Sequence, residues 1–185
     1  MLAESYPLKL SIGSTLTSPL FHDFPLHRVS RDGRRVVVLD RPFAVDDTSR
    51  VRITWLGLTG DTLLSKGYVS RAVSLTDAEW GERLDSRFSP DRPRPYGRRE
   101  FLEVSRRPRA HAAVGSFVIA RDGSLWLARE DSDPQVWVVL DPQGVPRFSV
   151  RLPMGLRIFD VADGRIYAVQ LDDFDVPYVH VYRIE

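Results

Sequence analysis

The chain of 185 residues contains no cysteine and very little lysine, and each shortage excludes something. Without cysteine there is no disulfide and no thiolate nucleophile, and cysteine usage gives no indication of the redox compartment. Only Lys9 and Lys66 are lysines, which leaves 26 − 2 = 24 arginines among the basic residues. This arginine excess suits pairing with carboxylates, but it also fits a bias of codon composition. The four histidines are scattered without the spacing of a metal site.

Long apolar runs are also absent. No stretch approaches the roughly 18 apolar residues of a membrane-spanning helix, so we expect no membrane span. Met1–Tyr6 lacks the basic and apolar regions of a signal peptide. The net charge is +1, so no overall excess of charge points to nucleic acid. The remaining composition, with 43% hydrophobic and 28% charged residues, is that of a globular domain with a real core.

A repeated unit is the main feature that the sequence does contain. Its two clearest copies begin at Asp122-Gly123 and Asp163-Gly164, and each continues with an apolar strand, a polar loop and a second apolar strand. Asp-Gly is a frequent hairpin turn. The separation of 163 − 122 = 41 residues lies in the range of a four-stranded propeller blade. The pattern therefore predicts an all-β fold, a partial β-propeller of about three four-stranded antiparallel blades.

A third copy of the unit begins at Asp32-Gly33. The continuous apolar run within Arg35–Asp40 is typical of a strand buried on both faces. Val51–Leu58 alternates between apolar and polar residues, as a strand with one buried face does. We therefore predict a blade over 26–69, an insertion over 70–114, a blade over 115–152 and an incomplete blade over 156–185, all within one domain of 1–185.

The insertion is rich in arginine and proline. Thr76 and Glu79 form the sequence pattern of a capping box, which predicts one short helix over Asp77–Leu84. The segment Ser89–Gly97 contains three prolines, which fix φ and remove donors, so we predict irregular structure there. Because the repeat continues on both sides, we interpret the segment as a connection between blades and not as a linker between domains.

The last blade lacks its fourth strand. In the middle blade, the glycine before the fourth strand follows the Asp-Gly glycine by 144 − 123 = 21 residues, and 164 + 21 = 185 is the last residue. Residues 6–12 alternate and are predicted to complete this blade; the alternative is a frayed terminal strand. Because propellers typically have 4 to 8 blades, the chain is expected to belong to a longer propeller or to complete a ring with a second copy. A different closed β fold is the third alternative.

Several stretches resemble bacterial six-bladed β-propellers of the NHL/TolB-like type, over about residues 30–185. They are Arg52–Leu63 (RITWLGLTGDTL), Ser74–Trp80 (SLTDAEW), Asp122–Arg129, Leu152–Leu156 and Asp173–Arg183. The resemblance implies an exported or envelope-associated binding scaffold, of which this chain covers about half a ring. The chain departs from the family in its shorter length and in lacking an export signal.

Charged loops supply the candidate binding site. In a propeller, the loops between the second and third strands share one face with the connections between blades, so acidic loops and part of the arginine-rich insertion should meet there. The candidate ligand-binding residues are Asp131, Asp133, Asp172, Asp173, Asp175, Arg107, Arg109 and His111. The alternative without a binding role is a set of solvated loops in which arginine and aspartate form ion pairs. No cofactor is predicted, although the carboxylates leave Ca²⁺ open without offering its full ligand spacing.

Catalytic and nucleic-acid roles find little support. His111 has no serine or cysteine nucleophile at motif spacing, so no catalytic residue is predicted. The arginine run with Tyr96 and Phe101 has the residue types of a single-strand nucleic-acid surface, but the interleaved acids argue against it.

We therefore expect a non-enzymatic module that recognises a protein or small polar ligand through its loop face, with self-association as a further expectation. The first alternative is a propeller-type hydrolase or lyase with a divalent metal in the central channel. The second is an incomplete fragment without independent function. Light scattering of the purified chain separates the fragment from a chain that completes its ring.

Overall fold

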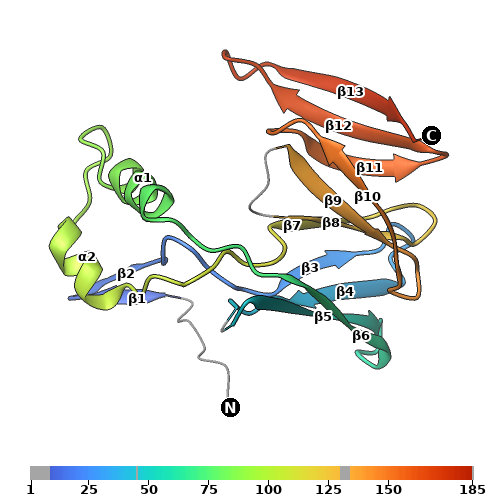
Figure 1. Cartoon of the computed structure of the whole chain (residues 1–185), viewed down its shortest axis with the longest axis horizontal. Coiled ribbons are helices and arrows are strands. Elements are labelled where there is room, and N and C mark those ends of the chain that lie inside the picture. The colour runs from blue at the N-terminus through green and yellow to red at the C-terminus, as the bar shows by residue number, and fades with distance from the viewer. Residues whose placement is uncertain (1–8, 45, 130–133, 185) are drawn as a thin grey trace.

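The computed structural model describes residues 9–44, 46–129 and 134–184. These residues form an all-β fold with several antiparallel sheets and two short helices (Figure 1). Two sheets have four strands and one has three, as expected for a partial propeller-like β fold. The predicted fold class is therefore confirmed.

Three sheets, named here the first, second and third sheet, make up most of the molecule, and each is a simple up-and-down meander. The first sheet contains β3 (Leu26–Val29), β4 (Arg35–Asp40), β5 (Thr48–Gly57) and β6 (Thr62–Arg71). The second contains β7 (Ser116–Ile119), β8 (Leu125–Ala128), β9 (Gln135–Leu140) and β10 (Pro146–Leu152). The third contains β11 (Arg157–Ala162), β12 (Arg165–Leu171) and β13 (Pro177–Arg183).

Each sheet begins with a hairpin at one of the three Asp-Gly turns. The turn glycines Gly33, Gly123 and Gly164 have φ values of 69°, 84° and 69°, a backbone conformation that residues other than glycine rarely adopt. Because the three turns join the first and second strands of their sheets, they lie at the same end of the molecule. We call this end the Asp-Gly face.

The first strands of the three sheets lie together, and the later strands extend outward from them. β7 contacts β3 on one side and β11 on the other, so the second sheet lies between the first and the third (Figure 1). This radial arrangement of separate meander sheets is the feature of a propeller that the repeat predicted.

The strand β8 shows how the second sheet is covered on both faces. Leu125 and Leu127 pack into an apolar core shared with the first sheet, whereas Trp126 and Ala128 pack into a core shared with the third. All four are at most 2% exposed. Alternation along one strand thus places consecutive apolar residues in two different cores.

A helical insertion leaves the first sheet after β6. The helix α1 (Asp77–Arg87) begins at Thr76 with the predicted capping box, in which the backbone N–H of Glu79 donates to Thr76 Oγ1 at 3.2 Å. In return, the Thr76 N–H donates to the Glu79 carboxylate at 2.8 Å. Neither α1 nor the shorter α2, the helices of the described residues, has the length and apolar character to cross a membrane.

The helix α2 (Arg98–Val104) is a second helix, whereas the sequence predicted only one. It follows the irregular proline-rich segment and begins where the Gly97 N–H donates to the Glu100 carboxylate at 2.7 Å. Its Phe101 is fully buried in a small core with Leu10 and Leu84. Packing and not local sequence pattern therefore stabilises this helix.

The first described strand differs from its prediction. Residues 6–12 were expected to complete the third sheet, and residues 6–8 lie outside the described part of the chain. The strand β1 (Leu10–Ile12) pairs instead with β2 (Thr15–Thr17) in a separate two-stranded sheet beside α2. Leu10 is only 4% exposed because the helices cover it. Within the described residues, β13 therefore has no strand on its outer side.

Candidate functional site

Of the two acidic loops predicted to supply ligands, the structure describes the loop 172–176. Asp131 and Asp133 lie outside the described residues. Asp172 Oδ1 accepts the backbone N–H groups of Phe174 and Val176 at 2.8 and 2.9 Å. These bonds lower the pKa of Asp172, with the bond from Val176 the larger cause, and they show that the carboxylate stabilises its own turn. Asp173 and Asp175 are exposed at the tip of the same loop.

The basic candidates lie beside α1. Arg107 forms an ion pair with Asp77 and donates to the Leu75 carbonyl at 2.8 Å. The Arg109 carbonyl accepts the Leu75 N–H at 3.0 Å, and its side chain is exposed.

The third of these candidates, His111, is buried and structural in its contacts. Its Nε2 lies 3.1 Å from the carboxylate of Glu79, and its ring meets the edge of Phe21. Arg107, Arg109 and His111 therefore hold the insertion together.

No contact joins these two groups of predicted residues. Within the described ranges, neither a hydrogen bond nor an ion pair connects Arg107, Arg109 or His111 to the loop 172–176. Those ranges also contain no group of three or more histidine, aspartate or glutamate residues that could hold a metal ion. The described candidates thus have separate local contacts, and Asp131 and Asp133 of the predicted face lie outside the described residues.

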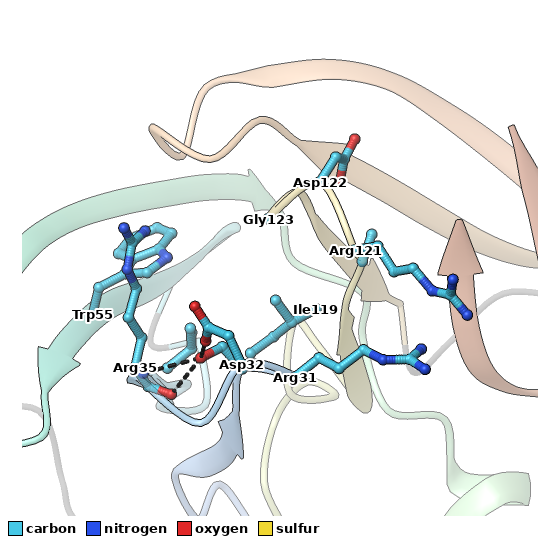
Figure 2. A pocket seen from close by; sticks show the side chains of 11 residues that line it. Arg31, Asp32, Arg35, Trp55, Ile119, Arg121, Asp122 and Gly123 are labelled. Atoms are coloured by element: carbon cyan, nitrogen blue, oxygen red, sulfur yellow. Dashed lines mark hydrogen bonds between the residues drawn. The ribbon is translucent and has the colours of Figure 1, made fainter. Parts of the chain in front are cut away.

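A cleft of about 450 Å³ lies instead at the Asp-Gly face, between the first and second sheets. One wall comes from the turn between β3 and β4 and the other from the turn between β7 and β8. Figure 2 shows polar side chains from both turns around this cleft. The lining residues are Ser30, Arg31, Asp32, Arg35, Val37, Trp55, Ile119, Ala120, Arg121, Asp122 and Gly123.

The deeper part of the cleft is apolar. Val37 and Trp55 come from the core-facing side of β4 and β5, and Ile119 is the last residue of β7. Trp55 is only 4% exposed, so its ring forms a fixed wall and not a mobile flap. An apolar wall with a few polar groups around it is the usual composition of a small-ligand site.

Each of the two carboxylates of the cleft accepts hydrogen bonds from its own turn through one oxygen, Oδ1. Asp32 accepts the Ser30 hydroxyl at 2.6 Å and the Arg34 N–H at 3.1 Å. The hydroxyl of Ser30 and then the backbone of Arg34 lower the pKa of Asp32. Asp122 likewise accepts the backbone N–H and the hydroxyl of Ser124, at 2.9 and 2.7 Å. Binding a ligand through Oδ1 of either aspartate would compete with the hydrogen bonds of its own turn.

The three guanidinium groups differ in their partners. Arg31 and Arg121 both donate to Oδ2 of Asp160, on the third sheet, at 2.7 and 2.9 Å. Within the described residues, the guanidinium of Arg35 has neither a hydrogen bond nor an ion pair, and only its backbone bonds to Ser30. Figure 2 shows Arg35 and Trp55 on one side of the cleft, with Arg31 and Arg121 extended next to each other on the other. The guanidinium of Arg35 therefore keeps its donors available for an acceptor in the cleft.

A second cleft, of about 550 Å³, lies between the second and third sheets at the same face. Of its two arginines, Arg147 is paired with Asp141 at 2.6 Å and Arg121 with Asp160 at 2.9 Å. Asp141 in turn accepts the backbone N–H groups of Gln143 and Val145. Both guanidinium groups of this cleft are thus already paired, and it is the weaker candidate.

The cleft lies at the end of the molecule opposite to the predicted loop face. The turns between first and second strands, and the loops between second and third strands, stand at opposite ends of a meander. A signal for the position of this cleft is present in the sequence, because Arg-Asp-Gly occurs at 31–33 and again at 121–123. Both of these arginines line the cleft.

Comparison with known proteins gives no relative from which a function could be carried over. No family model matches the sequence, and no curated protein matches it either.

Proposed function

We propose that the chain is a non-enzymatic binding module that holds a polar ligand in the cleft between its first and second sheets. The ligand presents acceptor oxygens, such as those of a carboxylate or phosphate group. The single observation that carries this proposal is the Arg35 guanidinium, which lines the cleft and makes neither a hydrogen bond nor an ion pair with the described residues, while Oδ1 of Asp32 and Oδ1 of Asp122 each accept donors of their own turn.

Three properties of the cleft support this proposal. Its volume of about 450 Å³ lies within the range of small-molecule sites. Guanidinium groups bind carboxylates and phosphates through two parallel hydrogen bonds. The wall formed by Trp55 and Val37 excludes water on one side, which strengthens a charge-assisted hydrogen bond near it.

The lining favours binding over catalysis. The hydroxyl of Ser30 donates to Asp32, and no histidine lies among the described lining residues. The groups that the cleft does supply are sufficient for binding. The resemblance to six-bladed propellers of the NHL/TolB-like type supports the same proposal, because it implies a binding scaffold. The acceptor group could belong to a small molecule or to an acidic side chain of a partner protein.

The proposal is tested by titrating the chain with inorganic phosphate, with succinate and with an oligoglutamate peptide, using calorimetry and the fluorescence of tryptophan. Arg35→Gln removes the charge while keeping much of the side-chain size, and it should weaken binding by roughly 10-fold or more. Arg151→Gln is the matched control, because Arg151 is an exposed arginine of β10 outside the cleft, and binding should stay unchanged.

The three probes distinguish the sources of the acceptor group. Tighter binding of phosphate or succinate identifies a small-molecule site, and tighter binding of the peptide identifies a protein partner. Absence of binding by all three, or equal affinity of the wild type and Arg35→Gln, would overturn the proposal.

A further inference from the structure

The third sheet has an apolar face that none of the described residues covers. Tyr167 pairs with Val181 and Val169 with Val179 across β12 and β13, so these four side chains lie on one face of the sheet. We call it the back face of the third sheet. Val179 and Val181 are 65% and 54% exposed, which is unusual for adjacent valines in a sheet. The opposite face, with Ile166 and Ala168, packs against the second sheet.

The second sheet shows what normally happens to this face. Trp126 and Ala128 are the third and fifth residues after Gly123, and Tyr167 and Val169 are the third and fifth after Gly164. Trp126 and Ala128 are 2% and 0% exposed because the third sheet covers them. The back face of the third sheet thus has the position of a junction face, without a next sheet among the described residues.

The first sheet carries the other half of such a junction. Val36 pairs with Leu56 and Val38 with Thr54 on the side of β4 and β5 that points away from the second sheet. We call it the front face of the first sheet. These four residues are partly exposed, whereas Leu125 and Leu127, on the corresponding side of the second sheet, are at most 1% exposed.

We propose that the back face of the third sheet packs on the front face of the first sheet of a second copy, and that the reciprocal contact closes a two-chain ring. The described residues of one chain form three radial sheets. Propeller rings typically contain 4 to 8, and the six sheets of two copies fall within that range. The back face of each chain contacts the front face of the other chain, and a twofold axis relates the two contacts.

Charge supports the same pairing. The exposed Asp173 and Asp175 stand at the end of the third sheet where β12 turns into β13. The exposed Arg50 and Arg52 lie in the first half of β5, just after the corresponding loop of the first sheet. When the sheets of a ring are aligned, the end of the third sheet with these two carboxylates meets the end of the first sheet with these two guanidinium groups, where Asp40 lies opposite Arg52. The pairing of Arg31 and Arg121 with Asp160 shows the same kind of link between sheets within one chain.

The first experiment measures the mass of the purified chain by sedimentation equilibrium. The ring requires 2 × 21.1 = 42.2 kDa. Val179→Glu places a charge in the proposed junction and should give the 21.1 kDa monomer with unchanged circular dichroism. Leu58→Glu is the matched control, because Leu58 is 74% exposed in the turn after β5, outside both faces, and this variant should remain a dimer.

The second experiment mixes two variants, each with a substitution in a different face of the junction. Val38→Glu disrupts the front face of the first sheet and should also give a monomer. When Val38→Glu and Val179→Glu are mixed, one of the two junctions in a mixed ring is intact, so part of the dimer should return. Each variant alone has no intact junction and cannot recover in this way.

Three outcomes overturn the proposal. The first is a monomeric wild type at roughly 100 μM, about 100 times a micromolar Kd. The second is a dimer that survives Val179→Glu, which would point instead to pairing at the outer edge of β13. The third is a mixture of the two variants that stays monomeric.

Discussion

The second and third sheets begin with the same unit, yet they have different surroundings. In both, an Asp-Gly turn leads into an apolar strand, β8 in one case and β12 in the other. Every described residue of β8 is buried because a sheet covers each of its faces. β12 alternates between buried and partly exposed residues because only one of its faces is covered. The contrast teaches that the junctions between sheets, and not the strands themselves, contain most of the buried apolar surface.

The largest effect is expected when the aromatic residue at one position of the repeat is replaced in each of the two sheets. Trp126→Ala should lower the free energy of unfolding by about 3–5 kcal/mol, because a fully buried ring is lost from the junction. Tyr167→Ala should lower it by about 1 kcal/mol or less, because that ring keeps contact with solvent. Urea denaturation at a concentration that keeps the chain monomeric measures both values. Equal losses would contradict the asymmetry between the two sheets.

A pair of glycine variants sharpens the comparison. Gly144 has a φ of 78°, and a Cβ there would lie 3.1 Å from side-chain atoms of Lys66 and Trp55 on the first sheet. Gly164 has a φ of 69° with open space around it. Gly164→Ala should therefore cost about 1 kcal/mol for its backbone alone, and Gly144→Ala about 2–3 kcal/mol for backbone and crowding together. Thermal or urea unfolding measures the difference, and a larger cost at Gly164 would contradict the packing of the second-sheet turn.

The smallest of the stability effects tests the point where all three sheets are linked. Burial raises the pKa of Asp160, but the hydrogen bonds and charges of Arg121 and Arg31 outweigh it and hold that pKa below its ordinary value. A carboxyl with a lowered folded-state pKa contributes stability above its unfolded value of about 3.9, and this contribution is lost as the pH falls through the folded-state pKa.

Asp160→Asn should therefore cost about 1 kcal/mol near pH 6, a modest value because both arginines are well exposed. The difference from the wild type should shrink as the pH is lowered below about 4. The measurement is urea denaturation over a pH series. Asp91→Asn, an exposed carboxylate of the insertion, is the control and should follow the wild type throughout. A difference that grows toward low pH would contradict the assigned role.

The sequence predicted the regular elements where local pattern decides them. The predicted strand Arg35–Asp40 coincides with β4, and the capping box at Thr76 marks the start of α1. The helix α2 was missed because it begins at a glycine without a capping side chain and depends on the burial of Phe101. Its stability comes from residues distant in the chain, which no local pattern contains.

The candidate site was less predictable than the fold. Counting acidic residues directed attention to loops such as 172–176, but Asp172 is occupied by the backbone of its own turn. The cleft arises only when the turns at 31–35 and 119–123 are brought together by the packing of two sheets. Their shared Arg-Asp-Gly sequence was visible, but nothing local to either turn shows that the two face one another.

The central claim is that the second sheet is covered on both faces and the third on one. Hydrogen–deuterium exchange of the monomeric chain, followed by mass spectrometry, tests it most directly, because β8 and β12 are each hydrogen-bonded on both edges and differ only in how their faces are covered. Peptides from β8 should exchange roughly 10-fold more slowly or slower still than peptides from β12. Equal exchange, or slower exchange in β12, would contradict the account.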